Sequence, residues 1–351
     1  MGDSIDVLLI TAEVEGEGSL AHTVAETPPL NLRGVATDSF SARDMLLGGM
    51  EKPVDVVLID LDTPKMNFVT FVRKVMRYSP LPVVVTGSFS FPDTAALAIK
   101  VLEAGAVEAV DKAKVLESSP EVLKGVVTKI ESAAKADREV IKNYANTDLI
   151  DTPNPLSFDG DSSFVVGIGA GTGGVWLVTR ILNQLPSNAP AVVIALPLPV
   201  ELPKAFAEYL DGISEMTVKE AQEGDPVEPG VALVAPSGVH TTVERDGQGS
   251  PVIRLREGPC LHCYCCPSAD VLFNSLANSM KEKAIGVLLS GGVCDGAMGL
   301  ARMKKAGAKT VVQAKDGCPL FDAPEHAIAI GAASMGVLPD KLAESILEQA
   351  K

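Results

Sequence analysis

The chain has 351 residues, of which 46% are hydrophobic and only 4% aromatic, and its formal net charge is −15. This length allows two domains that each bury a core. The acidic balance argues against nucleic acid and anionic lipid as partners, because binding to either needs clustered Lys and Arg. The first residues carry no basic leader, and no apolar run reaches the ~18 residues of a spanning helix. We therefore expect a cytoplasmic protein without membrane insertion.

Strand-like apolar runs alternate with helical stretches through the first part of the chain. The strands are expected at Asp6–Thr11, Val54–Asp60, Pro82–Thr86 and Ala106–Val110. The helices between them are expected at 42–48, 68–77 and 94–104, and a longer helix at about 121–145 ends the series. This alternation predicts a parallel sheet with helices packed on it, in a first domain at 1–145.

The segment 146–163 separates this domain from a second one. It reads NTDLIDTPNPLSFDGDSS, which has no periodicity and too little apolar surface to pack, so we expect a linker. A second α/β series then fills 164–351. Its strands are expected near 164–168, 191–196, 231–235, 285–290 and 309–313, and its last helix at about 339–349.

Two glycine-rich loops stand out, GIGAGTGG at 167–174 and SGGVCDG at 290–296. The first follows a buried strand and opens a helix, which is the elbow that in hydrolases presents a nucleophilic Ser. Here the expected position holds Gly171. The loop also has the G-x-G-x-x-G spacing of a dinucleotide site, but the next strand is followed by no acid before Glu201. We therefore favour the elbow.

Several longer stretches together resemble the chemotaxis protein-glutamate methylesterase family, in which a receiver domain precedes an esterase domain. They are FAEYL at 206–210, VKEAQEGDPVEPGVALVAPSGVH at 218–240, PSADVLFNSLA at 267–277 and IGVLLSG…DGAMGLARMKKAGAKTVVQ at 285–313. The resemblance covers nearly the whole chain. It implies a receiver-like, flavodoxin-like parallel sheet at 1–145 and a doubly wound α/β methylesterase-like domain at 164–351.

The resemblance also implies a Ser–His–Asp triad, of which this chain keeps one member. The Ser position is Gly171, the His position is Pro197 and the Asp position is Asp295. Gly has no nucleophile and Pro cannot take a proton, so Asp295 alone cannot support hydrolysis. We expect Asp295 to cap backbone N–H groups instead. Thr172 and Cys294 lie close by in sequence as substitute nucleophiles, without a His at the position of the base.

The receiver-like domain is likewise expected to lack several of the residues that receivers use for phosphorylation. Asp60 matches the phosphoryl acceptor of receivers and Lys112 their conserved Lys. The acidic pair that would bind Mg²⁺ falls on Thr11–Ala12, and the hydroxyl position falls on Gly87, one residue after Thr86. Phosphoryl transfer depends on the metal to neutralise developing charge. We therefore expect weak or absent phosphorylation of Asp60.

All six cysteines lie between 260 and 318, and four of them crowd into seven residues. Cys-x-x-Cys supplies two soft ligands, so a Zn²⁺ site or an iron–sulfur cluster is one reading; reduced thiols and a redox switch are the others. Cys318 is a further thiol that could complete such a site. The candidate ligands are Cys260, His262, Cys263, Cys265, Cys266 and Cys294.

The leading hypothesis is a pseudoenzyme, a methylesterase-like protein that works by binding in a chemosensory signalling pathway. The resemblance implies partners among the cytoplasmic regions of chemoreceptors or a chemosensory kinase. Two alternatives stay open. One is an active methylesterase or amidase that uses other residues, and the other is a metal or redox sensor formed by the cysteines.

Overall fold

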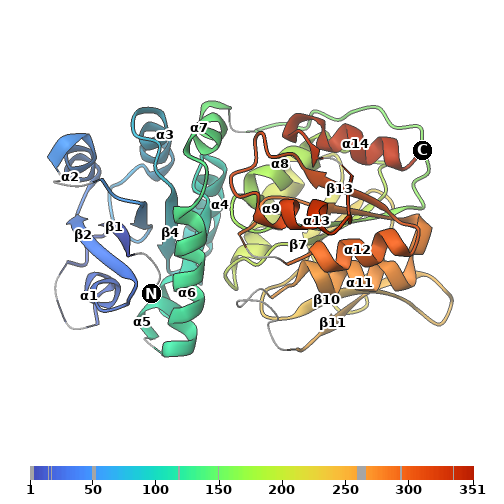
Figure 1. The fold of residues 1–351 in the computed structure, drawn as a ribbon, viewed down its shortest axis with the longest axis horizontal. Coiled ribbons are helices and arrows are strands. Elements are labelled where there is room, and N and C mark those ends of the chain that lie inside the picture. Colours follow the sequence, from blue (N-terminus) through green and yellow to red (C-terminus); the bar gives the residue numbers. More distant parts are fainter. Residues whose placement is uncertain are drawn as a thin grey trace. The chain divides into compact units, whose positions relative to one another are not determined.

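The structure is a computed structural model that describes residues 4–14, 16, 18–49, 53–117, 119–148, 150–258, 266–292, 295–334 and 336–351. The chain divides into two compact units, Met1–Leu149 and Ile150–Lys351. Both are α/β units built on parallel sheets (Figure 1). None of the helices in the described ranges combines the length and apolarity that a membrane crossing demands.

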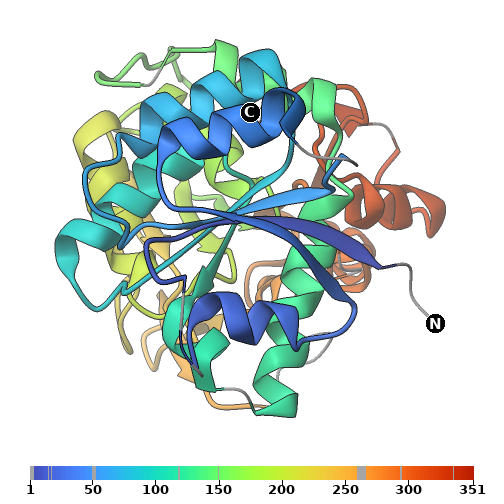
Figure 2. The same cartoon turned by 90° about the vertical axis from the view of Figure 1, so that its left-hand side faces the viewer.

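The amino-terminal unit is built on five parallel strands, in the order β2-β1-β3-β4-β5 among its described residues. This is the doubly wound order of flavodoxin-like folds, with helices on both faces of the sheet (Figure 2). Its elements are β1 (Ile5–Ile10), α1 (Leu20–Ala25), β2 (Leu30–Ala36), α2 (Ser39–Asp44) with a π-helical turn (Met45–Gly49), β3 (Val56–Asp60), α3 (Phe68–Tyr78), β4 (Val83–Gly87), α4 (Pro92–Glu103), β5 (Glu108–Asp111), α5 (Lys112–Glu117), α6 (Pro120–Ala134) and α7 (Arg138–Asn146).

The expectation of one helix over 121–145 is wrong, because the chain breaks between α6 and α7. Asp137 stands at the break with extended backbone, and its side chain accepts hydrogen bonds from the N–H groups of Glu139 and Val140. An aspartate in this role starts a new helix by satisfying donors that have no partner within the helix. The apolar periodicity continues across the break, which is why the sequence alone suggested one element.

The carboxy-terminal unit contains a seven-stranded parallel sheet in the order β14-β13-β12-β6-β7-β9-β8, and an antiparallel hairpin, β10–β11, both counted over the described residues. Its elements are β6 (Val165–Gly169), α8 (Gly174–Gln184), β7 (Ala191–Ala195), α9 (Leu202–Ile213), β8 (Thr217–Glu220), β9 (Val231–Val234), β10 (His240–Arg245), β11 (Pro251–Arg256), α11 (Ala269–Ser279), a 3₁₀ turn (Lys281–Lys283), β12 (Ala284–Leu288), α12 (Ala297–Lys305), β13 (Lys309–Gln313), α13 (Asp322–Ala329), β14 (Gly336–Val337), a 3₁₀ turn (Pro339–Lys341) and α14 (Leu342–Gln349).

The order of these strands places the helices on both faces of the sheet. The crossover from β6 to β7 and that from β12 to β13 run in opposite directions, so right-handed connections put α8 and α12 on opposite faces. Helix α11 packs on β6 on the α12 side. A Cβ on Gly169 would lie 2.5 Å from the Cβ of Ala269, and one on Gly167 would lie 2.4 Å from a methyl of Leu276. These two glycines are therefore needed for close packing of α11 on the sheet.

Two helical glycines are expected to respond to an alanine substitution with opposite signs. A Cβ on Gly299 in α12 would lie 2.8 Å from the carbonyl oxygen of Asp270 in α11, whereas a Cβ on Gly212 in α9 would meet nothing within 4 Å. Gly299→Ala should cost about 2 kcal/mol by overpacking. Gly212→Ala should stabilise by about 0.5 to 1 kcal/mol through helix propensity. Urea unfolding followed by the fluorescence of Trp176 checks both, and equal effects would contradict this packing.

The part of the expected linker that follows the unit boundary lies along the carboxy-terminal unit. The backbone N–H groups of Asn154 and Leu156 donate to the carbonyls of Asn183 and Gln184, and the N–H of Asp161 donates to Ala350. The expectation that 146–163 would not pack is therefore wrong for 150–163. Main-chain hydrogen bonds hold this segment, and apolar patterning cannot reveal them.

Candidate functional site

The three positions that correspond to the family's triad lie at the carboxyl edge of the larger sheet. Gly171 follows β6, Pro197 follows β7 and Asp295 follows β12, and these strands are neighbours in the order β12-β6-β7. This edge is where parallel α/β sheets place their binding sites. The loop after β7 is fixed by the Ser237 hydroxyl, which donates to the carbonyl of Leu198 at 2.5 Å. The residue types at 171 and 197 supply neither a nucleophile nor a base.

The glycine-rich elbow is closed against the loop after β12. The N–H of Gly171 donates to the carbonyl of Ser290 at 2.7 Å, and a Cβ on Gly171 would lie 3.1 Å from the Cα of Gly291. The buried Ser290 hydroxyl donates to the carbonyl of Thr172 and accepts from the N–H of Leu320. Ser290 was not singled out in the sequence, yet it joins three loops. A side chain at 171 would require the loop at 291 to shift by a few tenths of an ångström.

Asp295 uses its carboxylate at the amino end of α11. One oxygen accepts from the Ser268 hydroxyl at 2.7 Å and from the N–H of Asp270 at 3.1 Å, and the other accepts from the N–H of Ala269 at 2.7 Å. A carboxylate there satisfies orphan N–H donors and opposes the positive end of the helix dipole. This is the capping role expected from the sequence.

A histidine that the sequence analysis did not select, His240, lies beside Cys266 and Ser268. The Cys266 sulfur is 3.6 Å from His240 Nε2, and the N–H of Ser268 donates to His240 Nδ1 at 3.3 Å. Because Nδ1 accepts, the proton of the neutral ring lies on Nε2, which faces the sulfur. In this tautomer His240 offers the Cys266 sulfur a donor.

Most of the cysteine cluster lies outside the described residues, namely Cys260, His262, Cys263, Cys265 and Cys294. Cys266 and Cys318 are described, and both are buried. Burial raises the pKa of the Cys318 thiol to about 12, and this thiol donates to the carbonyl of Leu320. Burial therefore keeps the Cys318 thiol protonated at neutral pH. The described ranges contain no group of three side chains that could hold a metal ion.

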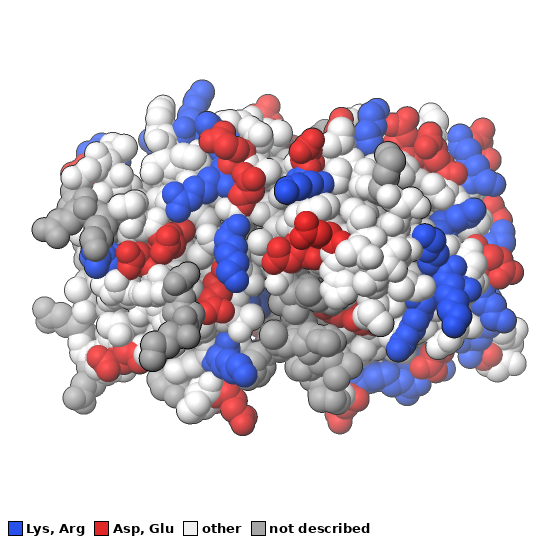
Figure 3. All heavy atoms as spheres, viewed as in Figure 1, with Lys and Arg blue, Asp and Glu red and all other residues white. Residues whose placement is uncertain are grey.

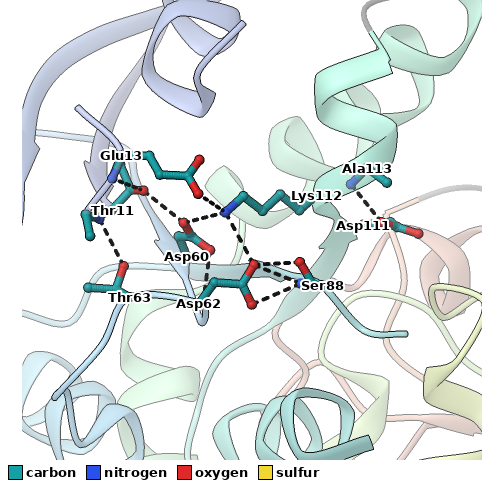
Figure 4. A network of polar contacts seen from close by, with 10 residues as sticks. Thr11, Glu13, Asp60, Asp62, Thr63, Ser88, Asp111, Lys112 and Ala113 are labelled. Carbon is teal, nitrogen blue, oxygen red and sulfur yellow. Dashed lines mark hydrogen bonds and ion pairs between the residues drawn. The ribbon is translucent and has the colours of Figure 1, made fainter. Parts of the chain in front are cut away.

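A second cluster of charged groups lies at the carboxyl edge of the smaller sheet (Figure 4). Asp60 ends β3 and is 1% exposed; it accepts hydrogen bonds from the Thr11 hydroxyl at 2.9 Å and from Lys112 Nζ at 3.0 Å. The same ammonium is 3.1 Å from a Glu13 oxygen and 3.3 Å from an Asp62 oxygen. The structure thus brings Asp60 and Lys112 together, and adds two acids that the sequence analysis missed.

Lys112 is fully engaged by this cluster. An ammonium has three N–H donors, and here three carboxylates surround it. Burial lowers the pKa of Lys112, but the carboxylates of Asp60, Glu13 and Asp62 outweigh this and hold the pKa above its usual value. Lys112 is therefore a permanent cation at neutral pH, and its charge offsets those of the surrounding acids.

Thr86 carries a hydroxyl one residue before Gly87, which ends β4. Thr86 pairs with Asp60 in the register of β3 and β4, so both side chains project from the same face of the sheet. Its Oγ1 is buried and has no hydrogen-bond partner within the described ranges. Thr86 thus places a hydroxyl one residue before Gly87, the position to which the resemblance assigns it, and on the same face of the sheet as Asp60.

The chain is similar to known proteins over its whole length. The family model described as CheB methylesterase matches residues 166–346. A "protein-glutamate methylesterase/protein-glutamine glutaminase 4" of Anaeromyxobacter dehalogenans is 35% identical over 346 residues, which covers 99% of this chain and 95% of the relative. A relative of the same kind from Caulobacter vibrioides is 35% identical over 356 residues, covering 99% and 98%.

A solved structure agrees with these relatives. The CheB methylesterase catalytic domain of Thermotoga maritima superposes with a TM-score of 0.51 at 30% identity, over 53% of this chain and 97% of that domain. The fold and the family expected from the sequence are thereby confirmed. With a family model over half of its length and relatives over nearly all of it, the chain belongs to the CheB methylesterase family.

Proposed function

We propose that this chain has lost ester and amide hydrolysis and acts by binding in a chemosensory pathway. The observation that carries the proposal is the state of the triad positions. Gly171 and Pro197 offer no reactive group, and the oxygens of Asp295 are held by the amino end of α11. Losing any one triad member costs on the order of 10⁴-fold in rate, and the members act as a unit.

Cys266 and His240 are the described residues that come closest to a substitute nucleophile and base, and their geometry also argues against hydrolysis. Cys266 and His240 are in contact, but the N–H of Ser268 opposes a proton on Nδ1 of His240. A thiolate–imidazolium pair needs protons on both ring nitrogens, so this contact does not favour a reactive thiolate through proton transfer to the ring. Cys266 is also buried.

Methanol and ammonia release test the loss of hydrolysis. The full-length chain is incubated with methylated and with Gln-containing chemoreceptor fragments, beside the Anaeromyxobacter dehalogenans relative as positive control. We expect no turnover above the background without protein. Turnover that disappears in Thr172→Val, Cys266→Ala or Cys294→Ala would overturn the proposal and identify the substitute nucleophile.

The partners proposed for this binding role are a chemoreceptor cytoplasmic region or a chemosensory kinase, and the compartment proposed is the cytoplasm. The relatives are named for an activity on protein glutamate and glutamine. A protein that keeps the family's scaffold without its chemistry can occupy the same partners and shield or scaffold them. Isothermal titration of the chain with receptor fragments checks this, and equal affinity for an unrelated helical protein would contradict it.

We propose further that the amino-terminal unit is not switched by phosphorylation of Asp60. Mg²⁺ would need the carboxylates missing at Thr11 and Ala12, and Lys112 already has an acceptor for each donor. Acetyl phosphate with Mg²⁺ should therefore leave the mass and the hydrogen exchange of the chain unchanged. The unpartnered hydroxyl of Thr86 instead favours phosphorylation of Asp60. A gain in mass that the Asp60→Asn substitution abolishes would show that Asp60 is phosphorylated.

A further inference from the structure

Basic side chains gather on one edge of the carboxy-terminal unit, in a chain whose net charge is −15. Figure 3 shows Lys and Arg side chains over the region of α11 and α12, toward the right of the view. All of the residues that make up this surface, which we call the basic face, are exposed. They are Arg245, Lys281, Arg302, Lys304, Lys305 and Lys309.

Neighbouring contacts connect the members of the basic face. Arg245 donates to the carbonyl of Ser279, two residues before Lys281. A Cβ on Gly307 would lie 3.7 Å from the Cβ of Glu282, which brings the turn between α12 and β13 against the 3₁₀ turn. Lys309 pairs in register with Ile285 on β12. The end of α12, the start of β13 and the 3₁₀ turn thus form one continuous surface, which also carries the exposed acid Glu282.

Local structural roles account for only part of this charge. Basic residues in the last turn of α12 stabilise the helix dipole, which explains Arg302, Lys304 and Lys305. The helix dipole does not explain Lys309, which begins a strand. Arg245 has a local role of its own, because its guanidinium donates to the carbonyls of Ser279 and Gly249. Within the described ranges none of the six residues forms an ion pair with an acid of this chain. Arg245 and Lys304 donate to backbone carbonyls of this chain. The charges available to a partner are therefore those of Lys281, Arg302, Lys305 and Lys309.

The basic face lies at the amino edge of the parallel sheet, because β12 and β13 both begin there. The positions of the triad follow the carboxyl ends of the same sheet, so the two surfaces are on opposite edges. A partner on the basic face would leave the carboxyl edge uncovered. This arrangement suits a protein that connects two partners.

We infer that the basic face docks an acidic helix of another protein. Arg302 and Lys305 are one helical turn apart, with about 5 to 6 Å between their Cβ atoms, and can meet Glu or Asp side chains at the same spacing on a partner helix. A long polyanion such as nucleic acid would extend beyond the face and meet the acidic remainder of the chain. The inference rests on the proposed binding role and supplies its partner chemistry.

Fluorescence anisotropy with the full-length chain tests this inference. The probe is a labelled helical peptide with a row of Glu along one face, and the control peptide has Gln at the same positions. We expect the Glu peptide to bind, salt to weaken the binding, and Arg302→Ala/Lys305→Ala/Lys309→Ala to weaken it about tenfold or more. The matched variant Lys114→Ala/Lys124→Ala/Lys135→Ala removes the same charge from exposed positions of the other unit and should bind as the original chain does.

Three outcomes would overturn the inference. They are equal binding of the Glu and Gln peptides, equal weakening by both triple variants, and tighter binding of a single-stranded oligonucleotide of the same net charge. Circular dichroism of both variants verifies that the fold is kept. The readout is independent of methanol release, so this inference and the proposed loss of hydrolysis can fail separately.

Discussion

Lys112→Met is expected to destabilise the amino-terminal unit by about 3 to 5 kcal/mol, because removing one partner leaves buried charges without compensation. Asp60 is 1% exposed and the Lys112 side chain 8%. Hydrogen exchange of the amides in β1, β3 and β4, read by mass spectrometry, reports the loss. Lys142→Met is the control. Lys142 is half-buried and pairs with the exposed Glu139, so its loss should cost less than about 0.5 kcal/mol.

The difference in stability between the original chain and Lys112→Met depends on pH, because the pKa of Lys112 is raised in the folded state. A group whose pKa is higher in the folded than in the unfolded state contributes its full stabilisation below the unfolded value, here 10.5, and loses it as pH rises through the folded value. The gap between the original chain and Lys112→Met should therefore be constant through neutral pH and shrink above pH 10.5. A gap that already closes near neutral pH would show that Lys112 is not held as an ammonium.

Asp295→Ala should lower the unfolding free energy of the carboxy-terminal unit by about 3 kcal/mol. The change removes a charged acceptor that receives the Ser268 hydroxyl and two N–H groups of α11. Urea unfolding followed by Trp176, the single tryptophan of the chain, measures it. Asp322→Ala is the control, because Asp322 is an exposed acid in the first turn of α13.

The same variants separate the capping role of Asp295 from a remaining catalytic one. Asp295→Asn keeps one acceptor oxygen and should lose less stability than Asp295→Ala. Catalytic side chains are often strained, and replacing them commonly leaves stability unchanged or higher. An Asp295→Ala chain as stable as the original would therefore refute the cap and reopen the question of catalysis.

Sequence reasoning located the central strands well, because strands covered on both faces are continuous apolar runs. VVGIG of β6 and AVVIA of β7 are buried throughout. It missed β2, whose sequence LNLRGVA is half-buried at the sheet edge and includes Arg33, and it missed α1, which has only six residues. Elements at the edge of a sheet lack a strong apolar pattern, because their solvent-exposed positions can hold polar residues.

Site residues could be predicted from the sequence where they lie at the end of a strand. Asp60 and Lys112 could be named from the resemblance to receivers, because Asp60 ends one recognisable strand and Lys112 directly follows another. The contact of His240 with Cys266 joins residues that are 26 apart in the sequence, and no local pattern signals it. Glu13 lies beyond the expected acidic pair, and only the path of the chain after β1 brings its carboxylate to Lys112. Such contacts depend on tertiary geometry.

The segment from residue 150 to residue 163 has a practical consequence for dissecting the protein. A fragment that begins at Phe164 would lack two hydrogen bonds. One runs from the Asn183 side chain to the carbonyl of Thr152, and the other from the N–H of Asp161 to the carbonyl of Ala350. It would also expose the neighbouring backbone of α8 and α14 to water. A carboxy-terminal half intended to fold alone should start no later than Ile150, and a protease that nicks within 150–163 would be expected to loosen that half even though it removes no helix or strand.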